Sequence, residues 1–375
     1  MKVALFGGSF NPVHIEHVNI VKSAIKSLSL DKVIVMPSNI TPYKEGRIFT
    51  DAADRLNMCR LAFADIPQAV VSDYEIAQRG VSYSYLTCRK FKEEYEDAER
   101  YFIVGGDMLE NFSKWKYPEE ILKCVTLAVF AREDVETFNR AQNKFSARFG
   151  REIVAFDYIG RKVSSTKIRT LAAIDEDIEE YVGKSVANYI REHNLYKIEG
   201  LSEVKNYVSE KRWEHTIGVA LFAAENCARY GISEEKAIIA ATLHDCAKNL
   251  NFDSPELKGF VCPEGVPAPV VHQFAGAYMA EHLFKITDAD ILNAIRYHTT
   301  GRENMSDLEK LIFISDMLEE GRTFKGIKEL RKAFAEDTEK GLYVVYEFVL
   351  NYIKCKNEPI YPLTEQGFEY LKRKN

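Results

Sequence analysis

The sequence predicts an α/β doubly wound (Rossmann-like) domain with a parallel sheet, followed by an all-α domain. Short apolar runs alternate with helical stretches over the first half of the chain. In the second half, apolar residues recur with a 3.6-residue period, and no strand-like alternation of useful length interrupts them. At roughly 150 residues per domain, a chain of 375 residues has room for two such domains.

The first half contains five runs that we expect to be strands. Each is short and apolar, and two of them end in paired glycines, which favour a turn after a buried strand. The runs are Lys2–Phe6, Lys32–Pro37, Tyr101–Val104, Val125–Phe130 and Ile153–Phe156. Helical stretches such as Asp51–Ala64 and Ser84–Tyr95 lie between them. Strands that alternate with helices predict a parallel sheet, whose ligands bind at the carboxyl ends of the strands.

The second half begins where this alternation stops, near residue 160. We expect domains of residues 1–196 and 197–375, with a boundary at Tyr196–Leu201, because Gly200 can end a helix there. The clearest helical segments beyond it are Ala220–Tyr230, Glu235–Asn249, Ala275–Phe284, Ala289–His298, Leu308–Leu318 and Gly341–Tyr352.

Composition limits the partners and the compartment. The net charge is −6, from 50 basic and 56 acidic residues, so no basic footprint for nucleic acid is present. The seven cysteines include no pair with C-x-x-C spacing, which favours reduced thiols and a cytoplasmic location. No apolar run reaches the roughly 18–20 residues of a membrane span, so we expect no membrane partner.

The first motif directly follows the first expected strand and reads Gly7-Gly8-Ser9-Phe10-Asn11-Pro12-Val13-His14-Ile15-Glu16-His17. Glycines let the backbone approach a phosphate closely, and a helix starting near Pro12–His14 would point its free N–H groups at the same place. His14 and His17 lie three residues apart and therefore share one face of that helix. Two imidazoles there can stabilise the charge of a leaving pyrophosphate. We therefore predict a phosphate cradle at this turn.

A second cradle is predicted at Val163-Ser164-Ser165-Thr166-Lys167-Ile168-Arg169. A run of hydroxyls before a helical segment is typical of an N-cap, and taken alone an ordinary cap is the simpler interpretation. Hydroxyls together with Lys167 and Arg169 also suit a polyphosphate. The pairing of this segment with the first motif favours phosphate binding.

These two motifs, in this order, resemble the HxGH-type nucleotidyltransferase superfamily and, more narrowly, the bacterial nicotinate-nucleotide adenylyltransferases. The resemblance covers about residues 1–196. It implies transfer of the adenylyl group of ATP to nicotinate mononucleotide, which gives deamido-NAD and pyrophosphate in NAD biosynthesis. The mononucleotide phosphate would attack the α-phosphorus in line, so catalysis would rest on positioning and charge stabilisation. His14, His17, Lys167 and Arg169 would supply most of it, with Mg²⁺ bound through the substrate phosphates.

Three further landmarks follow the order of that family. They are Met36-Pro37-Ser38-Asn39 through Tyr43-Lys44, Gly80-Val81-Ser82-Tyr83-Ser84, and Ile103-Val104-Gly105-Gly106-Asp107-Met108 with Trp115 beyond it. The resemblance implies that substrate or nucleotide is bound by Gly7, Gly8, Ser9, Phe10, Lys44, Ser82, Tyr83, Ser84, Gly105, Asp107, Trp115, Ser164, Ser165 and Thr166. Nicotinamide mononucleotide is the main competing substrate.

Three positions depart from the family pattern. Glu16 replaces the usual glycine between the two histidines and adds a negative charge near a phosphate pocket. Asn11 replaces the commoner aspartate and keeps hydrogen-bonding capacity, and Ser84 replaces threonine. None of the three removes a catalytic group.

Histidines and aspartates in the second half form an ordered series, H…HD…H…H…D. A buried carboxylate beside a buried imidazole is costly unless both are paired or bound to a metal. Imidazoles mixed with carboxylates suit a first-row ion such as Fe, Mn, Co, Ni or Zn. Any one histidine could be an ordinary core residue, but the set favours a metal site. Its members are His215, His244, Asp245, His272, His298 and Asp316. His282 lies outside the series, and we expect it to serve packing or to lie on the surface.

This half resembles the HD-domain hydrolase superfamily and, more closely, the bacterial HD family that splits diadenosine tetraphosphate into two ADP. The marks are His244-Asp245-Cys246-Ala247-Lys248, His272 with Gly276-Ala277, Ile295-Arg296-Tyr297-His298-Thr299-Thr300-Gly301, Ile314-Ser315-Asp316 and Glu319-Glu320-Gly321-Arg322. The resemblance implies that the six residues of the series hold one or two transition-metal ions, with iron expected. It also implies catalytic roles for Asp245 and Lys248, and phosphate contacts from Lys248 and Arg322.

The sequence thus favours a bifunctional cytoplasmic enzyme whose small-molecule partners are ATP, nicotinate mononucleotide and diadenosine tetraphosphate. Two alternatives stay open for the helical half. It could be a binding module that senses nucleotides and regulates the first half. It could also be a phosphohydrolase for another nucleotide, such as a cyclic dinucleotide, (p)ppGpp or a deoxynucleoside triphosphate.

Overall fold

The computed structural model describes residues 1–39, 46, 48–130, 135–158 and 160–374. The chain forms two compact units. Unit 1 comprises Met1–Lys44, Phe49–Ile168 and Ile178–Leu195, and unit 2 comprises Glu45–Ile48, Arg169–Asp177 and Tyr196–Asn375. The main change of unit therefore falls between Leu195 and Tyr196, and two shorter segments from earlier in the chain also join unit 2. Across the described ranges, no helix is both long and apolar enough to span a bilayer.

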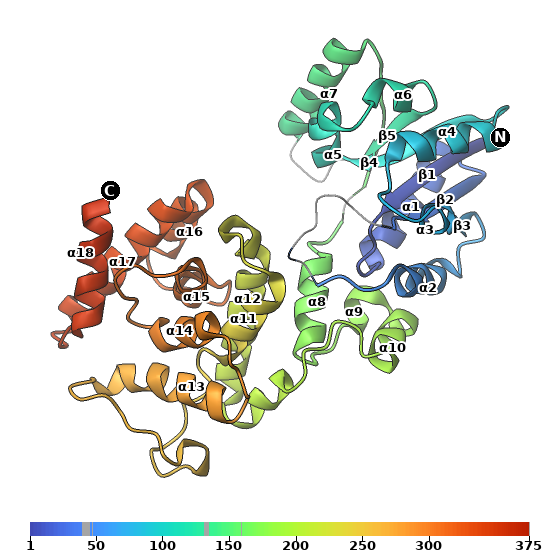
Figure 1. The fold of residues 1–375 in the computed structure, drawn as a ribbon. Coiled ribbons are helices and arrows are strands. Elements are labelled where there is room, and N and C mark those ends of the chain that lie inside the picture. Colours follow the sequence, from blue (N-terminus) through green and yellow to red (C-terminus); the bar gives the residue numbers. More distant parts are fainter. Residues whose placement is uncertain (40–45, 47, 131–134, 159, 375) are drawn as a thin grey trace. The chain divides into compact units, whose positions relative to one another are not determined.

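Unit 1 is built on a six-stranded parallel sheet in the order β3-β2-β1-β4-β5-β6 (Figure 1). The strands are β1 (Lys2–Gly8), β2 (Lys32–Pro37), β3 (Ala69–Val71), β4 (Glu99–Gly105), β5 (Thr126–Phe130) and β6 (Val154–Phe156). The doubly wound α/β prediction is confirmed. The strand order reverses between β1 and β4, so the loops that follow these two strands diverge and leave room for a ligand.

The five expected strands are all present, with ends shifted by a few residues. The sixth, β3, was not predicted. It has only three residues and pairs with β2 at the edge of the sheet, where Val70 is exposed. A strand that short shows too little alternation for its sequence to stand out.

Several helices of unit 1 bury an apolar stripe. In α1, for example, Ile20, Ala24 and Leu28 recur at four-residue spacing and are buried. The helices are α1 (Ile15–Leu28), α2 (Ala52–Phe63), α3 (Tyr74–Ala77), α4 (Ser84–Glu94), α5 (Gly106–Asn111), α6 (Pro118–Leu122), α7 (Val135–Phe149), α8 (Ser165–Ala173), α9 (Glu179–Val182) and α10 (Lys184–Glu192). The second half of α8 belongs to unit 2.

Unit 2 contains helices and no strand among its described residues, which confirms the all-α prediction. Its main helices are α11 (Glu210–Asn226), α12 (Glu234–Leu243), α13 (Val271–His282), α14 (Ala289–Tyr297), α15 (Asp307–Leu318), α16 (Ile327–Glu336), α17 (Thr338–Cys355) and α18 (Pro362–Lys374). Alanines of α11 and α12 and the aliphatic side chains of α14 and α15 form the buried core. Small residues let these helices approach closely, which is how they bring their polar side chains together.

The expected helix Glu235–Asn249 is wrong at its carboxyl end. Helix α12 stops at Leu243, and residues 244–249 form successive turns. A regular helix would point adjacent side chains about 100° apart. The tighter turns allow His244 and Asp245 to face the same cluster.

Two candidate active sites

The loop between β1 and α1 forms the first cradle. A Cβ atom at Gly8 would lie 3.0 Å from the Phe10 ring, so the loop needs glycine there. The Phe10 side chain is 2% exposed and packs against the rings of Phe6 and His17, with centroids 5.6 and 5.0 Å away. The Phe10 ring thus packs the loop from within.

His14 and His17 lie together at the start of α1, with ring centroids 3.7 Å apart. The backbone N–H of His14 donates to Nδ1 of His17 over 3.1 Å. Because Nδ1 accepts this bond, the neutral His17 ring carries its proton on Nε2. The Nε2–H group is the kind of donor that a phosphate oxygen requires.

Arg55 of α2 ties the loops of this site together. Its side chain is fully buried, and its guanidinium donates to the backbone carbonyl oxygens of Ser9 (2.7 Å), Ser38 (2.6 Å), Asn39 (2.8 Å) and Thr50 (3.2 Å). One guanidinium thereby connects the loop after β1 to the loop after β2. The sequence offered no signal for this role, because a single arginine within a helix usually faces solvent.

The second cradle lies beside the first. Ser164 caps α8 by accepting a hydrogen bond from the Lys167 backbone N–H (3.1 Å). The Ser165 hydroxyl donates to the carbonyl oxygen of Pro12 (3.0 Å), two residues before His14. Thr166 follows in the first turn of α8, and the ammonium of Lys167 lies 4.5 Å from the centre of the Tyr181 ring. Hydroxyls and amides of both motifs therefore surround one region.

Arg169 is placed differently from the sequence expectation. Its guanidinium is 2% exposed within unit 2, where it forms a bidentate ion pair with Glu234. Nη2 lies 2.6 Å from Oε1, and Nε lies 3.0 Å from Oε2. The structure thus gives Arg169 a buried carboxylate as partner, and its expected grip on phosphate stays a prediction.

The residues expected near the nicotinate ring gather around the loop after β2. The Ser82 hydroxyl accepts a hydrogen bond from the Asn39 backbone N–H (3.0 Å). The ammonium of Lys116 lies over the Tyr83 ring, 4.0 Å from its centre. Ser84 is the first residue of α4. Lys44, expected at the mononucleotide phosphate, lies outside the described residues.

The loop after β4 forms the other side of the switch point. A Cβ atom at Gly105 would lie 2.5 Å from Oδ1 of Asp107, so glycine is needed for the Asp107 carboxylate to fold back over the loop. Trp115 is half-buried, and its ring packs on Phe102 and Phe112 with centroids 6.0 and 5.3 Å away. Gly8 and Gly105 thus end the two strands between which the sheet order reverses.

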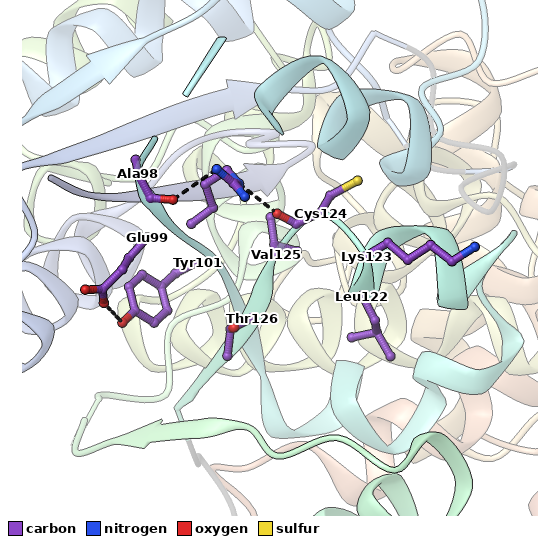
Figure 2. Close-up of a pocket in the computed structure, with 9 residues that line it drawn as sticks. Ala98, Glu99, Tyr101, Leu122, Lys123, Cys124, Val125 and Thr126 are labelled. Carbon is purple, nitrogen blue, oxygen red and sulfur yellow. Dashed lines mark hydrogen bonds between the residues drawn. The ribbon is translucent and has the colours of Figure 1, made fainter. Parts of the chain in front are cut away.

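A surface hollow also lies on unit 1, at the amino ends of β4 and β5 (Figure 2). It is lined by Ala98, Glu99, Arg100, Tyr101, Leu122, Lys123, Cys124, Val125 and Thr126. The Arg100 guanidinium donates to the carbonyl oxygens of Ala98 and Cys124, both over 3.0 Å. Ligands of parallel sheets bind at the opposite, carboxyl ends, so this hollow is separate from the predicted site.

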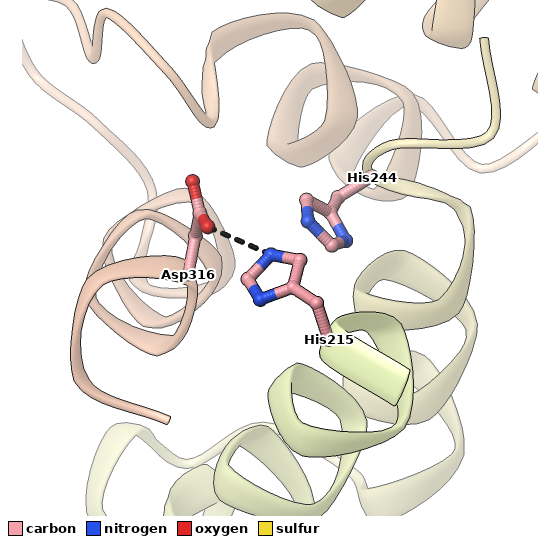
Figure 3. A group of neighbouring side chains, drawn as sticks. All are labelled: His215, His244 and Asp316. Atoms are coloured by element: carbon pink, nitrogen blue, oxygen red, sulfur yellow. Dashed lines mark ion pairs between the residues drawn. The ribbon is translucent and has the colours of Figure 1, made fainter. Parts of the chain in front are cut away.

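The second site is a cluster of imidazoles and carboxylates in unit 2. His215 of α11, His244 after α12 and Asp316 of α15 form one group, and Figure 3 shows them converging. His244, Asp245 and His298 form an overlapping group, and in each group the candidate ligand atoms lie within 4.8 Å of one another. His215 Nε2 is 3.0 Å from Asp316 Oδ1.

His272 joins the second group from α13. Its Nε2 lies 3.2 Å from Asp245 Oδ1 and 3.2 Å from His298 Nε2. Burial, and beyond it the neighbouring His298 imidazole, lowers the pKa of His272 to about 2. The ring is therefore neutral at physiological pH, which is the form that binds metal ions. The structure brings all six residues of the predicted series together.

The carboxylates of the cluster are held in their charged form. Burial raises the pKa of Asp245, but the imidazoles of His244 and His298 outweigh it and hold the pKa well below its usual range. Burial likewise raises the pKa of Asp316, but the neighbouring imidazoles of His215 and His244 and the charge of Arg322 outweigh it. Charged carboxylates and neutral imidazoles are both ligands for a divalent cation.

The buried atoms of this cluster fit a metal ion. Among the described residues, His244 Nε2 and Asp245 Oδ1 are buried and make no hydrogen bond. Unpaired buried polar atoms are costly, and a cation between them would satisfy both. The mixed nitrogen and oxygen donors fit a first-row transition ion better than Mg²⁺ or Ca²⁺, which prefer oxygen alone.

Basic side chains stand around the cluster. The Lys248 ammonium lies 3.0 Å from His272 Nε2, and burial lowers its pKa against the raising effect of the Asp245 and Asp316 carboxylates. Arg322 donates to Asp316 Oδ1 over 2.5 Å, and Arg212 donates to Asp245 Oδ2 over 2.8 Å. Lys248 and Arg322 are thus close enough to the cluster to meet a phosphate bound there.

Comparison with known proteins matches one family to each half of the chain. Residues 5–171 match the cytidylyltransferase-like family, and residues 212–321 match the HD domain family. A probable nicotinate-nucleotide adenylyltransferase of Clostridium perfringens (strain SM101 / Type A) is 34% identical over 200 residues, covering 53% of this chain and 99% of the relative. The chain belongs to the nicotinate-nucleotide adenylyltransferase family.

Some members of the family are similar to this chain well beyond the N-terminal half. A probable nicotinate-nucleotide adenylyltransferase/Ap4A hydrolase of Mycoplasma genitalium is 27% identical over 365 residues, covering 94% of this chain and 99% of the relative. Among solved structures, a predicted HD superfamily hydrolase involved in NAD metabolism from Clostridium acetobutylicum is 34% identical. It covers 47% of this chain and 96% of that one, with a TM-score of 0.42. The match of residues 212–321 to the HD domain family shows that an HD domain follows the adenylyltransferase domain here.

The structure adds one residue to the HD site that no ligand pattern indicated. Glu319 is buried after α15, and its Oε1 accepts a hydrogen bond from His215 Nδ1 over 3.1 Å. Burial raises the pKa of Glu319, but this bond outweighs it, so the carboxylate stays charged. A Cβ atom at Gly218 would lie 2.5 Å from Oε2, so the glycine makes room for it. Such a carboxylate fixes the ring orientation of a ligating histidine.

Proposed function

We propose that this chain is a bifunctional enzyme of nucleotide metabolism. Unit 1 transfers the adenylyl group of ATP to nicotinate mononucleotide and forms deamido-NAD and pyrophosphate. Unit 2 hydrolyses diadenosine tetraphosphate symmetrically to two ADP. The names of the relatives support both activities. The observation that carries the first is the hydrogen bond from Ser165 to Pro12, which brings the two phosphate-binding motifs to one place.

In unit 1, the chain positions the reactants and stabilises charge. The mononucleotide phosphate attacks the α-phosphorus of ATP, and the bond to the pyrophosphate oxygen breaks. The N-terminus of α1 and the His17 Nε2–H group face the charge that develops on the leaving pyrophosphate. Lys167 and the hydroxyls of Ser164 and Thr166 hold the polyphosphate from the other side, while the Ser165 hydroxyl holds the two motifs together through Pro12. No side chain has to act as a nucleophile, and Mg²⁺ enters with ATP.

A side-by-side rate comparison on the two mononucleotides tests the first activity. The full-length chain is incubated with ATP, Mg²⁺ and either nicotinate or nicotinamide mononucleotide. We expect a higher kcat/KM on nicotinate mononucleotide than on nicotinamide mononucleotide. One pyrophosphate should be released for each dinucleotide formed. Preference for the amide would reject the substrate assignment, and transfer to neither would reject the activity.

In unit 2, the six clustered residues would hold one or two transition-metal ions, and we propose iron. When bound, such an ion supplies Lewis-acid activation of water and charge neutralisation at a phosphate. Glu319 orients His215, and Arg212 and Arg322 hold the Asp245 and Asp316 carboxylates in place. Lys248 grips the phosphates of the substrate beside His272. The observation that carries this proposal is the pair of buried atoms without hydrogen bonds, His244 Nε2 and Asp245 Oδ1.

The second activity is tested on the full-length chain loaded with iron or manganese. We expect diadenosine tetraphosphate to yield ADP as sole nucleotide product. Formation of ATP and AMP would reject symmetrical cleavage. A metal-replete chain that releases no ADP, yet binds the nucleotide and changes the rate of adenylyl transfer, would make unit 2 a sensor. All seven cysteines are thiols, in keeping with the cytoplasm as the compartment that we propose.

A further inference from the structure

Glu16 stands between the two histidines of the first cradle, and its side chain is 2% exposed. A buried carboxylate so close to a phosphate site is unfavourable unless hydrogen bonds compensate for the lost water. Hydrogen-bond partners therefore have to offset the cost of burying Glu16, and they show which segment of the chain Glu16 holds in place.

Two partners of Glu16 lie 142 and 145 residues further along the chain. The Tyr158 hydroxyl donates to Oε2 of Glu16, and the backbone N–H of Arg161 donates to the same oxygen over 2.8 Å. The other oxygen accepts a weaker bond from Asn19 over 3.3 Å. The Tyr158 ring itself packs edge-on against Phe130 of β5, with centroids 5.6 Å apart. Glu16 thus connects the start of α1 to a segment anchored on the sheet.

This segment leads directly into the second cradle. A Cβ atom at Gly160 would collide with Oε2 of Glu16, so the backbone passes immediately over the carboxylate. Only Lys162 and Val163 separate the Arg161 amide from Ser164, which caps α8. Beyond the cap, Ser165 donates to Pro12. The stretch from Gly160 to Ser165 is therefore attached to the α1 region at both of its ends.

We propose that Glu16 is a positioning residue for adenylyl transfer, because its carboxylate fixes the second phosphate cradle against the helix that carries His14 and His17. This inference rests on the proposed function of unit 1. Both cradles must meet the same polyphosphate in the transition state. A misplacement of about 1 Å can lower the rate by about a hundredfold. Glu16 acts at a distance from the reacting atoms and is not itself a catalytic residue.

The test compares steady-state kinetics of Glu16→Gln, Glu16→Ala and Tyr158→Phe with the wild-type chain, all at full length. We expect kcat to fall by about tenfold to a hundredfold in the Glu16 variants, with Glu16→Ala below Glu16→Gln because the amide can still accept one bond. The KM for the mononucleotide should stay within about threefold, since the loop after β2 is not touched. Partial unfolding would also lower the apparent kcat without changing KM, so the rates are compared per folded molecule.

A double variant, Glu16→Gln with Tyr158→Phe, sharpens the result. Because the two side chains share one hydrogen bond, their effects on kcat should be less than additive. Glu93→Gln, an exposed glutamate of α4, is the matched control and should leave both constants unchanged. Thermal unfolding shows which variants are folded, and if Glu16→Gln does not fold, Tyr158→Phe decides.

Folded variants with a kcat within about twofold of wild type would overturn the positioning role while the activity itself stands. A wild-type chain that transfers adenylate to neither mononucleotide would overturn the proposed function and this inference together.

Discussion

The two candidate sites of this chain suit a phosphate in opposite ways. Unit 1 presents backbone amides, hydroxyls and imidazoles at the carboxyl ends of β1 and β4, where the strand order of the sheet reverses. Unit 2 instead collects imidazoles and carboxylates inside a helical core, where His244 and Asp245 are buried. The first arrangement supplies hydrogen-bond donors to an anion directly. The second is itself anionic or neutral at its centre and needs a cation before it can attract a phosphate.

The difference predicts how each site responds to loss of one component. The first site depends on the relative position of two short motifs, so it should tolerate removal of transition metal and be sensitive to shifts of backbone. The second depends on an ion held by side chains from several helices. Its hydrolysis activity should be lost without metal. Its metal affinity should fall when a residue that orients a ligand is replaced.

Removal of metal should separate the two sites most strongly. Treatment of the full chain with a chelator, followed by transfer into buffer with Mg²⁺ only, should reduce diadenosine tetraphosphate hydrolysis by more than about a thousandfold. Adenylyl transfer should stay within about twofold. Metal analysis checks the removal, and added iron or manganese should restore hydrolysis. Hydrolysis that persists in metal-free protein would contradict the account of unit 2.

His17→Ala should have the next largest effect, and it should impair adenylyl transfer instead of hydrolysis. Loss of one donor to the developing charge lowers kcat of adenylyl transfer by about a hundredfold to a thousandfold. The fold and the hydrolysis rate should not change. The control is His193→Ala, which removes an exposed histidine of the same unit. Near-normal transfer by the His17 variant would refute the role of the first cradle.

Glu319→Gln should weaken the second site without removing a ligand. Loss of the charged partner of His215 is expected to lower metal affinity by about tenfold to a hundredfold. Competition with a coloured chelator measures the affinity independently of turnover. Glu320→Gln, the exposed neighbour, should keep wild-type affinity. Equal affinities in the two variants would show that Glu319 does not support His215.

Ser165→Ala should give the smallest of these effects. It removes the hydrogen bond to Pro12, which contributes about 0.5–1.5 kcal/mol, so adenylyl transfer should slow by less than about tenfold. Ser113→Ala, at an exposed position of the same unit, serves as control. A loss as large as that of His17→Ala would mean that the hydroxyl contacts the substrate itself.

The sequence predicted the fold class and the ligand series because both rest on local patterns. Runs such as Lys32–Pro37 match β2 residue for residue. The residues that support the sites were harder to predict. Arg55 and Glu319 are charged side chains whose burial follows from tertiary packing, and nothing in their neighbours along the chain signals it. Arg169 shows the converse, since a residue within a recognisable motif has a buried carboxylate as its partner.

The assignment of residues 45–48 and 169–177 to unit 2 has a practical consequence for anyone who wishes to study the helical half alone. Expression of residues 197–375 would omit Ala173 and Ile174 from its interior and leave Glu234 without its arginine. An isolated buried carboxylate of this kind typically destabilises a protein by about 3–5 kcal/mol. Such a fragment would lack part of its core and one buried ion pair. Its failure to fold would say nothing about the chemistry of its histidines.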